Sequence, residues 1–381
     1  MYEISIVPCR DYEYAAVKQA LSEALSAIDG LSAVRPGMKV ALKTNLVVGS
    51  APEKACVTHP AVLAALTELV RERGAEVIIG DSPGGPFAEG YLKGVYRKSG
   101  LSLAEEKGAV LNRNFEKSEC SFPAGKVMKQ ISCTSWLLEA DLIIGVCKLK
   151  THAMMRMSAN VKNFFGAIPG TMKPEYHYRF PDHTDFADML VDINEFLKPC
   201  LYVTDAIVGM EGNGPTSGNP RQIGALLAGR NPYELDKVCA HLIGLKAEEV
   251  PTIRAAEARG LAEAGESGSG SGGKIYGNPE QFVVSDFKNI EKAGEITFSD
   301  HFPKFLLPAA TALMQARPLV KKSECIGCGK CRDVCPMKAI RMERKKPVID
   351  RKACIRCFCC QEFCPKGAMK AHRRALLRLL S

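Results

Sequence analysis

Eight cysteines near the end of the sequence are spaced so that they could bind clusters of metal ions. They form two runs of the pattern C-x2-C-x2-C-x3-C-P, namely Cys325, Cys328, Cys331 and Cys335, and then Cys354, Cys357, Cys360 and Cys364. Thiolates at intervals of three positions on a tight loop can reach three corners of one cubane iron–sulfur cluster. The two runs therefore predict two cluster-binding loops.

A zinc site is the alternative interpretation of these cysteines. Zinc takes four ligands, commonly as two CxxC pairs, whereas each run here has three evenly spaced cysteines, a fourth, and a proline. The pattern favours two clusters over zinc. Cys359 falls outside the spacing and is interpreted as a spectator thiol. The scattered cysteines of the first 300 residues are typical of small buried apolar residues in a reducing compartment.

The region from about residue 321 to 369 resembles the bacterial two-cluster ferredoxin domain. In that domain the fourth cysteine of each run binds the other cluster. The resemblance implies two [4Fe-4S] clusters, low-potential one-electron transfer, and a protein electron donor or acceptor. One cluster would be held by Cys325, Cys328, Cys331 and Cys364, and the other by Cys354, Cys357, Cys360 and Cys335.

Polar residues that could bind and act on a substrate follow several apolar runs earlier in the chain. Lys148, Lys150 and His152 close one such run and combine two cations with a group that titrates near neutral pH. We interpret these three as candidate catalytic residues, and a solvated loop is the alternative.

Further candidates for substrate binding come from four other places in the sequence. They are Lys43 and Asn45 at the end of another apolar run, His59 at a helix start, Asp81 in a glycine-rich turn, and Asp205 with Glu211 around a Gly-rich stretch. Such positions suit an anion or a metal. Each also has a plain structural interpretation as a cap or a turn.

The elements that position these residues alternate between short apolar runs and amphipathic segments. Strands are predicted at residues 4–8, 39–43, 76–80, 142–147, 201–205 and 223–228, and helices at 12–28, 59–73, 186–197 and 232–245, with Thr58 as the cap of the second helix. Short apolar runs are typical of strands buried on both faces. We predict a layered α/β domain with a largely parallel or mixed sheet, followed by a small α+β ferredoxin domain.

The four polar stretches of the large domain, in their order, resemble the uncharacterised family known as domain of unknown function 362. The matching motifs are Lys43/Asn45, Thr58/His59/Pro60, Lys148/Lys150/Thr151/His152, Lys162/Asn163/Phe165/Gly166 and Asp205/Gly209/Gly212/Gly214/Pro215. The sequence departs from the family pattern at Cys147, where proline is usual, and at Ala206, where glycine is usual. The resemblance covers about residues 1–260, and fusion to a ferredoxin domain is common in the family. The family layout distantly resembles the nickel-pincer lactate racemase fold.

Charge and length suggest two domains of different character. Residues 321–381 carry 17 Lys and Arg against 5 Asp and Glu, whereas the whole chain of 381 residues has a net charge of +9. We expect a large domain at 1–300, a connector at 301–320 and the ferredoxin domain at 321–381.

Neither a membrane-spanning run nor a secretory signal is visible, so a cytoplasmic location is expected. Nothing in the pattern indicates nucleic-acid binding.

Three functions are consistent with these patterns. The first is a ferredoxin-coupled oxidoreductase that binds a small anionic substrate in the large domain. The second is a non-catalytic electron carrier whose large domain docks redox partners, and the third is a non-redox isomerase with a structural ferredoxin. Lysines lining a cleft would favour the enzyme, and lysines on a flat exposed face would favour the carrier.

Overall fold

The computed structural model describes residues 2–265, 272–290 and 317–372. The chain divides into two compact units, residues 1–289 and 290–381, and each is described by itself. Residues 301–316 of the expected connector lie outside the described residues. Residues 317–320, which we had assigned to that connector, are a strand of the small unit.

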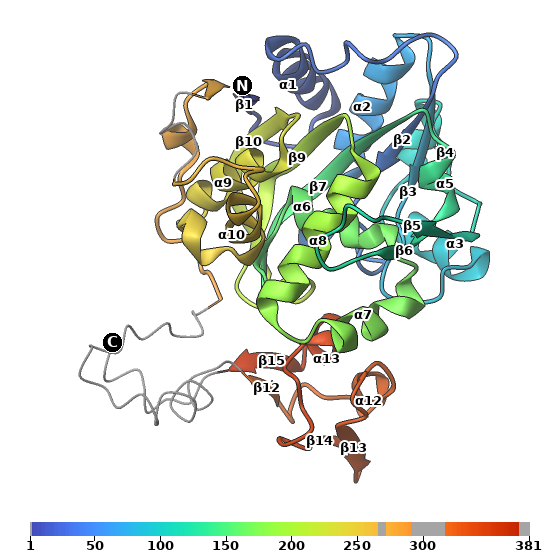
Figure 1. Ribbon diagram of the computed structural model, residues 1–381, viewed down its shortest axis with the longest axis vertical. Coiled ribbons are helices and arrows are strands. Elements are labelled where there is room, and N and C mark those ends of the chain that lie inside the picture. Colours follow the sequence, from blue (N-terminus) through green and yellow to red (C-terminus); the bar gives the residue numbers. More distant parts are fainter. Residues whose placement is uncertain (1, 266–271, 291–316, 373–381) are drawn as a thin grey trace. The chain divides into compact units, whose positions relative to one another are not determined.

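The large unit is built on one mixed sheet (Figure 1). Its strands are β1 (Tyr2–Pro8), β2 (Lys39–Lys43), β3 (Glu76–Gly80), β4 (Val110–Leu111), β7 (Leu142–His152), β8 (Arg156–Ser158), β9 (Leu201–Glu211), β10 (Asn219–Gly229) and β11 (Gly273–Tyr276). The order is β11-β1-β10-β9-β7-β2-β3-β4, with β8 paired to β7. Strands β9, β7, β2, β3 and β4 run parallel, while β10 is antiparallel to both of its neighbours. The predicted α/β class is confirmed.

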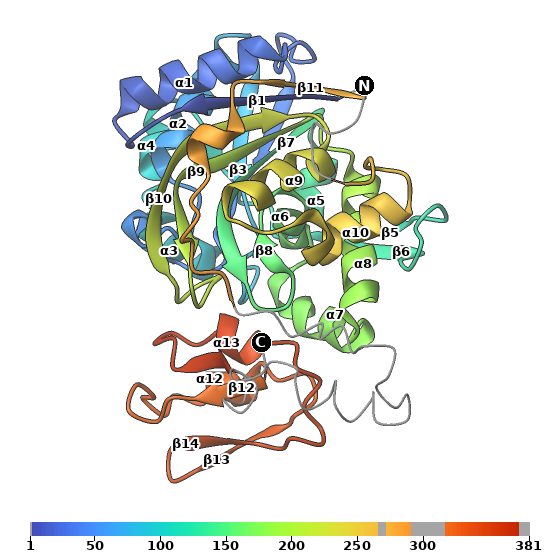
Figure 2. The same ribbon diagram turned by 90° about the vertical axis from the view of Figure 1, so that its left-hand side faces the viewer.

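Helices cover both faces of this sheet, as Figures 1 and 2 show. One face carries α1 (Tyr14–Ala27), α2 (Pro60–Arg71), α3 (Glu89–Lys98) and α4 (Ser102–Glu106), and the other carries α6 (Asn160–Asn163), α8 (His183–Leu197), α9 (Pro232–Leu242) and α10 (Pro251–Ala258). Successive residues of a strand point to opposite faces, so Val40 and Leu42 of β2 pack with α1 and α2, whereas Ala41 packs in the other core. Burial on both faces explains the apolar runs.

The remaining described helices and strands of the large unit are short. They are the β5–β6 hairpin (Lys117–Ser121 and Gln130–Thr134), α5 (Ser135–Leu138) and α7 (Lys173–Arg179), together with short 3-10 turns such as η1 (Pro52–Lys54) and η2 (Phe164–Ala167). None of these was predicted from the sequence. Their length leaves too few residues for a periodic pattern to show.

Two strands are longer than predicted, and this changes where the polar residues lie. Strand β7 continues to His152 because its end pairs with β8, and β9 continues to Glu211 because it pairs with β10. Lys148 and Lys150 therefore lie within a strand and not after its end, while Asp205, predicted as the last residue of its strand, lies in the middle of β9. The predicted strands end where the first charged residues appear, although most of the residues that follow in β7 and β9 are also buried.

The short helix α6 is held in place by one buried carboxylate from α9. Asp236 accepts hydrogen bonds from the backbone N–H of Asn160 (2.8 Å) and of Val161 (3.2 Å), and from the Asn160 side-chain amide (3.0 Å). Burial raises the pKa of Asp236 to about 7. These bonds satisfy donors at the start of α6 that have no partner inside the helix. Asp236 thereby fixes the segment that carries Asn163.

The small unit consists of two short antiparallel strand pairs and two single-turn helices. They are β12 (Arg317–Val320) with β15 (Met369–His372), β13 (Ile340–Glu343) with β14 (Lys346–Ile349), α12 (Lys330–Asp333) and α13 (Cys359–Glu362). Its apolar core contains the side chains of Cys331, Ile340, Cys360 and Met369. Two of the predicted cluster cysteines thus lie in the centre of this unit.

Within the described ranges, no helix has both the length and the apolar character needed to cross a membrane.

Replacement of Asp236 by alanine should destabilise the large unit. The two backbone N–H groups and the amide would lose a buried acceptor, at a cost of about 3 kcal/mol. Urea unfolding of the full chain, followed by circular dichroism, measures this. The matched control is His241→Ala at the exposed end of the same helix, where a surface pair with Glu280 is lost and the change should stay below about 1 kcal/mol. Equal effects of the two substitutions would contradict the role given to Asp236.

Candidate functional site

The first buried ion pair lies where β2 and β3 end. These strands are parallel neighbours, so Lys43 at the end of β2 lies opposite Gly80, and Asp81 follows directly. The Lys43 Nζ atom is 2.7 Å from Asp81 Oδ1, and both side chains are buried. Lys43 also donates to the Thr44 carbonyl (2.6 Å) and to Asn163 Oδ1 (3.2 Å). Burial lowers the pKa of Lys43, and the Asp81 carboxylate opposes this shift.

Gly166 lets the chain approach this ion pair closely. A Cβ atom at Gly166 would lie 2.0 Å from Asp81 Oδ1 and 2.5 Å from Lys43 Nζ, well inside van der Waals contact. The glycine belongs to η2, which follows α6. Only a residue without a side chain fits between this turn and the pair.

The second ion pair joins β7 and β9. Lys148 and Asp205 are directly opposite each other in the parallel register, and Lys148 Nζ is 2.6 Å from Asp205 Oδ2. Lys148 also donates to the Tyr12 hydroxyl (2.6 Å), and Tyr12 donates to Asp205 Oδ1 (2.9 Å). The backbone N–H of His59 donates to Asp205 Oδ2 (3.0 Å). Burial lowers the pKa of Lys148, opposed by the charge of Asp205.

The ring of His59 lies beside this second pair and caps α2. Its Nδ1 atom accepts a hydrogen bond from the Ala61 N–H (3.2 Å), so His59 takes the capping role that we predicted for Thr58. The Thr58 hydroxyl instead donates to the Val146 carbonyl (2.9 Å). The His59 ring stacks on Tyr12, with centroids 3.6 Å apart. Burial lowers the pKa of His59 to about 4, so this ring is neutral at pH 7.

Lys150 is a third buried lysine, and it differs from the other two. Its side chain is fully buried and donates to Asn45 Oδ1 (2.6 Å) and to the Cys56 carbonyl (2.7 Å). Among the described residues, no carboxylate lies within ion-pair distance of its Nζ atom. Burial lowers the pKa of Lys150 to about 8. No carboxylate of the described residues thus contacts this ammonium group, and the more distant charge of Asp81 offsets only part of the effect of burial.

Two asparagine side chains connect the first pair to Lys150. Asn45 Nδ2 donates to Asn163 Oδ1 (3.2 Å), which also accepts from Lys43, while Asn45 Oδ1 accepts from Lys150. Lys43 lies near the α6 side of the sheet, and Lys150 contacts the segment before α2. The contact between the two amide side chains lies just beyond Lys43, the last residue of β2, so it joins the two faces of the sheet around the end of that strand. One continuous polar network therefore spans the edge of the sheet.

His152 is the last residue of β7, and the turn that leads to β8 is hydrogen-bonded to its ring. Its Nδ1 atom accepts the backbone N–H groups of Met154 and Met155, each at 3.1 Å. A ring whose Nδ1 is an acceptor carries its proton on Nε2 when neutral. The predicted proton-transfer residue can therefore donate only from Nε2, and half of its hydrogen-bonding capacity holds the β7–β8 turn.

Glu211 does not join the other predicted residues. Its carboxylate accepts the backbone N–H of Lys288 (3.0 Å) and faces that lysine's ammonium at 3.9 Å. Its contacts are those of an anchor between the end of β9 and the segment at 288. The described contacts of Glu211 do not include Asp205, because β9 continues as a strand past Asp205 and ends only at Glu211.

Sequence reasoning missed several groups that complete the network. Tyr12 was taken as the first residue of a helix, and nothing in its neighbourhood marks it as a partner of Lys148. The Cys56 carbonyl is a backbone atom, which sequence cannot single out. Asn163 was part of a recognised motif but was not chosen as a site residue. Its spacing from Lys162 and Gly166 was the signal that could have found it.

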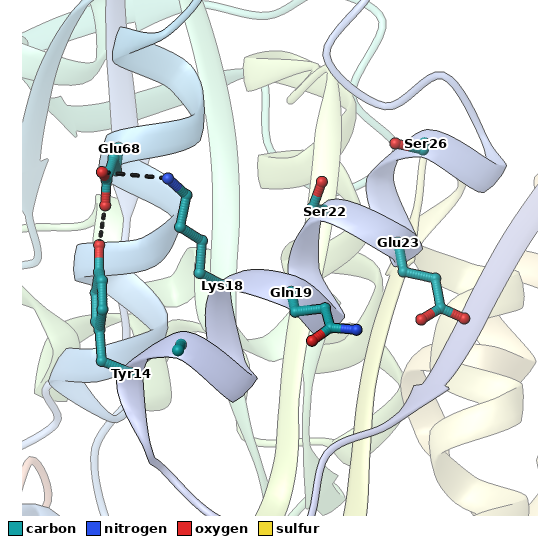
Figure 3. Close-up of a pocket in the computed structure, with 8 residues that line it drawn as sticks. Tyr14, Lys18, Gln19, Ser22, Glu23, Ser26 and Glu68 are labelled. Atoms are coloured by element: carbon teal, nitrogen blue, oxygen red, sulfur yellow. Dashed lines mark hydrogen bonds and ion pairs between the residues drawn. The ribbon is translucent and has the colours of Figure 1, made fainter.

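A surface depression on α1 lies apart from these residues (Figure 3). It is lined by Tyr14, Ala15, Lys18, Gln19, Ser22, Glu23, Ser26 and Glu68. Glu68 lies between Tyr14, which donates to it, and Lys18, whose Nζ is 3.2 Å from Glu68 Oε1. No residue predicted for the site lines this depression. Exposed ion pairs of this kind contribute little to stability or specificity.

In the small unit, cysteines from both runs surround one cavity. Its lining includes Cys325, Cys328, Cys331 and Cys364. Burial raises the pKa of Cys331, and the neighbouring thiols of Cys364, Cys325 and Cys328 raise it further. This is the combination of three cysteines from one run and the fourth from the other that the ferredoxin resemblance implies. The residues present fit a cubane cluster at this place.

The other four cysteines are also neighbours. Burial raises the pKa of Cys360 well above its usual range, and the charges of Cys357, Cys354 and Cys335, together with that of Cys331 from the first set, act in the same direction. Cys359 is buried, and its thiol hydrogen-bonds the sulfur of Cys357, which lowers the pKa of Cys357. Cys359 thus contacts one cysteine of this set, as a hydrogen-bond donor to its sulfur.

The zinc alternative can be compared with the positions of these thiols. A single zinc ion requires its sulfur ligands at about 2.3 Å. Across the described ranges, no three side chains of His, Cys, Asp or Glu converge on a point that could hold one metal ion.

Comparison with known proteins identifies both units. A family described as "Domain of unknown function (DUF362)" matches residues 40–241, and one described as "4Fe-4S dicluster domain" matches residues 317–365. A thylakoid-associated protein of Synechocystis sp. is 33% identical over 269 residues, which are 68% of this chain and 79% of that protein. The small unit is a ferredoxin-type domain that binds iron–sulfur clusters and transfers electrons.

Two solved structures show a distant likeness in fold. The lactate racemase apoprotein from Thermoanaerobacterium thermosaccharolyticum aligns with a TM-score of 0.41 and 13% identity, covering 65% of this chain and 57% of that one. A Thermotoga maritima protein aligns with a TM-score of 0.39 and 15% identity, covering 63% and 61%. The chain spans less than two thirds of either structure, and these similarities are too low to indicate a shared activity.

Replacement of Gly166 by alanine should disrupt the Lys43–Asp81 pair. The added methyl group would overlap both charged groups and force them apart, at a cost of about 3 kcal/mol. Thermal unfolding of the full chain measures the loss. Gly94→Ala in α3 is the matched control, because nothing lies within 4 Å of a Cβ atom there, and alanine should stabilise that helix by about 0.5–1 kcal/mol. A Gly166→Ala protein as stable as Gly94→Ala would refute the close approach.

Proposed function

The chain belongs to the DUF362 family and carries a 4Fe-4S dicluster domain, and on that basis we propose that it is an iron–sulfur oxidoreductase acting on a small anionic substrate. The substrate binds at the strand ends of the large unit, and electrons pass through the small unit. The observation that carries this proposal is Lys150, a fully buried lysine whose described neighbours include no carboxylate.

Buried charge explains why Lys150 points to an anion. Taking an ammonium group out of water costs several kcal/mol unless an opposite charge compensates it. Lys43 and Lys148 have this compensation from Asp81 and Asp205. An anion such as a carboxylate or a phosphate would supply it for Lys150. The two paired lysines, which we had expected to hold the anion directly, instead shape the surroundings.

The other residues of the network have supporting roles in this proposal. Asn45 orients the Lys150 ammonium group through its Oδ1 atom. His152 donates a proton from Nε2, because Nδ1 is committed to the backbone. His59 and Tyr12 hold Asp205 in place opposite Lys148. Because Lys150 is completely buried, the segment that contains Asn45 and Cys56 must move for a substrate to enter.

Two [4Fe-4S] clusters would serve as the electron relay. When bound, they supply one-electron transfer at low potential. In the proposed arrangement, Cys325, Cys328, Cys331 and Cys364 hold one cluster, and Cys354, Cys357, Cys360 and Cys335 hold the other. Support comes from the cavity that the first four cysteines line and from the mutual proximity of the second four.

The alternative function, a carrier whose large unit only docks partners, has less support. It would use the lysines of the large unit as an exposed docking face. Lys43, Lys148 and Lys150 are buried, with at most 1% of each exposed. Buried lysines cannot form an exposed docking face, so their position counts against this alternative.

Anion binding should depend on Lys150 and on pH. Lys150→Met should weaken binding of oxalate or inorganic phosphate at least about 10-fold at pH 7, because a charge-assisted contact is lost. Wild-type affinity should fall as the pH rises from 7 to 9, since the ammonium group deprotonates near pH 8. Isothermal titration calorimetry measures both effects, and Lys39→Met, at the opposite end of β2, is the control. Equal affinity of Lys150→Met and wild type would remove Lys150 from the site.

The stability of the free protein gives an independent test of the same lysine. The folded pKa of about 8 is below the value of 10.5 for an unperturbed lysine. The folded state therefore binds this proton more weakly than the unfolded state. The free energy of unfolding of the wild type, relative to that of Lys150→Met, should rise as the pH increases from 8 to 10.5. This gain should be lost again as the pH falls back through 8. A flat difference over that range would contradict the burial of a charged Lys150.

Crossed ligation can be tested with one serine substitution and a neighbouring control. Cys364→Ser should remove the cluster of the first run, so iron in anaerobically purified protein should fall from about eight to about four atoms per chain. Cys359→Ser should keep about eight. Iron and acid-labile sulfide analysis with electron paramagnetic resonance of the reduced protein would measure this. Loss of the second-run cluster instead, or zinc in place of iron, would overturn the assignment.

A further inference from the structure

The internal repeat of the small unit makes its two cysteine loops directly comparable. Cys325 corresponds to Cys354, so Ile326 matches Ile355 and Cys328 matches Cys357. Ile326 is 59% exposed, and Cys328 is exposed as well. Their counterparts in the second loop are only partly exposed. The first loop therefore presents an apolar side chain and a thiol to solvent.

The two loops also differ at the start of their short helices. Gly329 and Phe358 are equivalent, and both have a positive φ, of 76° and 60°. The residue that follows is the exposed Lys330 in the first loop and the buried Cys359 in the second. Phe358 itself is 2% exposed. The first loop is thus open and basic where the second is closed and apolar.

A basic hairpin is attached to the first loop. Arg344 and Lys345 form the exposed turn between β13 and β14. Lys346 donates to the Cys325 carbonyl (2.7 Å), and a Cβ atom at Gly327 would be 2.6 Å from the Lys345 carbonyl oxygen. The turn therefore lies directly against the loop that carries Cys325 and Cys328.

The same hairpin borders the cavity of the first cysteine set. Met342 and Pro347 line that cavity together with Ile326, Lys330 and Lys366. Positive charge thus surrounds the edge of the cavity next to the exposed Ile326. The unit as a whole has the same sign, with 17 Lys and Arg against 5 Asp and Glu in residues 321–381.

We propose that Ile326, Cys328, Lys330, Arg344 and Lys345, the first-loop face, form the docking surface for an acidic one-electron carrier protein. This inference rests on the proposed function, because it requires a cluster behind Cys328. The carrier loses one electron and the cluster held by Cys325, Cys328, Cys331 and Cys364 gains it. No bond forms or breaks, and no proton is transferred.

The composition of the first-loop face suits such a short-lived complex. Opposite charges at the rim of an interface speed up encounter and orient the partners, while adding little to the lifetime of the complex. The single apolar side chain of Ile326 gives a small desolvated centre close to the cluster. An anionic membrane would also be attracted by this positive charge, but it would not need to approach Cys328. This difference allows an experiment to distinguish a membrane from a carrier protein.

The test uses the full chain with its clusters and a reduced plant-type [2Fe-2S] ferredoxin as the acidic donor. Stopped-flow absorbance measures the rate of cluster reduction at increasing ionic strength. The first variant is Arg344→Glu/Lys345→Glu. The matched control is Lys338→Glu/Lys352→Glu, which makes the same change in net charge at two exposed residues that do not line the cavity. Reduction by dithionite and iron content show whether each protein has intact clusters.

We expect the wild-type rate to fall steeply with salt, because screening weakens charge steering. The hairpin variant should be slower by about 10-fold or more at low salt, and the control within about 2-fold of wild type. Equal slowing of both variants, or a rate independent of salt, would overturn the docking surface while leaving the clusters established. Binding of both wild type and hairpin variant to vesicles containing phosphatidylglycerol, with no rate difference, would also overturn it. Absence of iron and sulfide in the wild type would instead refute the proposed function.

Discussion

The structure of the large unit depends on the cost of burying three ammonium groups at one edge of a sheet. Each would lose several kcal/mol of hydration without a compensating partner. Lys43 and Lys148 recover it from Asp81 and Asp205, at 2.7 and 2.6 Å. Lys150 has only neutral oxygens around it among the described residues. That imbalance is the observation on which the proposed anion site rests.

The parallel arrangement of β9, β7, β2 and β3 brings these groups together. Carboxyl ends of parallel strands meet at one edge, where ligands bind in many α/β folds. Here the two ion pairs sit between neighbouring strands, and the Asn45–Asn163 contact carries the network from one face of the sheet to the other. Asp236 and Gly166 fix the segment on which Asn163 lies. Asp236 accepts hydrogen bonds from the start of α6, and Gly166 allows the turn after α6 to approach the Lys43–Asp81 pair.

The sequence was most informative where a pattern depends only on local spacing. The strands at 39–43 and 76–80 were predicted with their observed bounds, and the two cysteine runs identified the small unit. The ends of β7 and β9 were not predicted, because antiparallel pairing with β8 and β10 extended them past their apolar runs. Tyr12 could not be connected with Lys148, since a contact across 136 positions leaves no local trace.

The unequal exposure of the two cysteine loops has a consequence for how the protein behaves in air. Solvent exposure and hydrogen bonds to the sulfur ligands are among the factors that set the reduction potential of an iron–sulfur cluster. Cys328 is exposed, whereas its counterpart Cys357 is partly covered and hydrogen-bonded by Cys359. In the proposed ligation, the cluster bound by Cys328 would therefore be the more open of the two to solvent and to dissolved oxygen. Its selective loss in air would leave a protein with a single cluster and would hide the original stoichiometry.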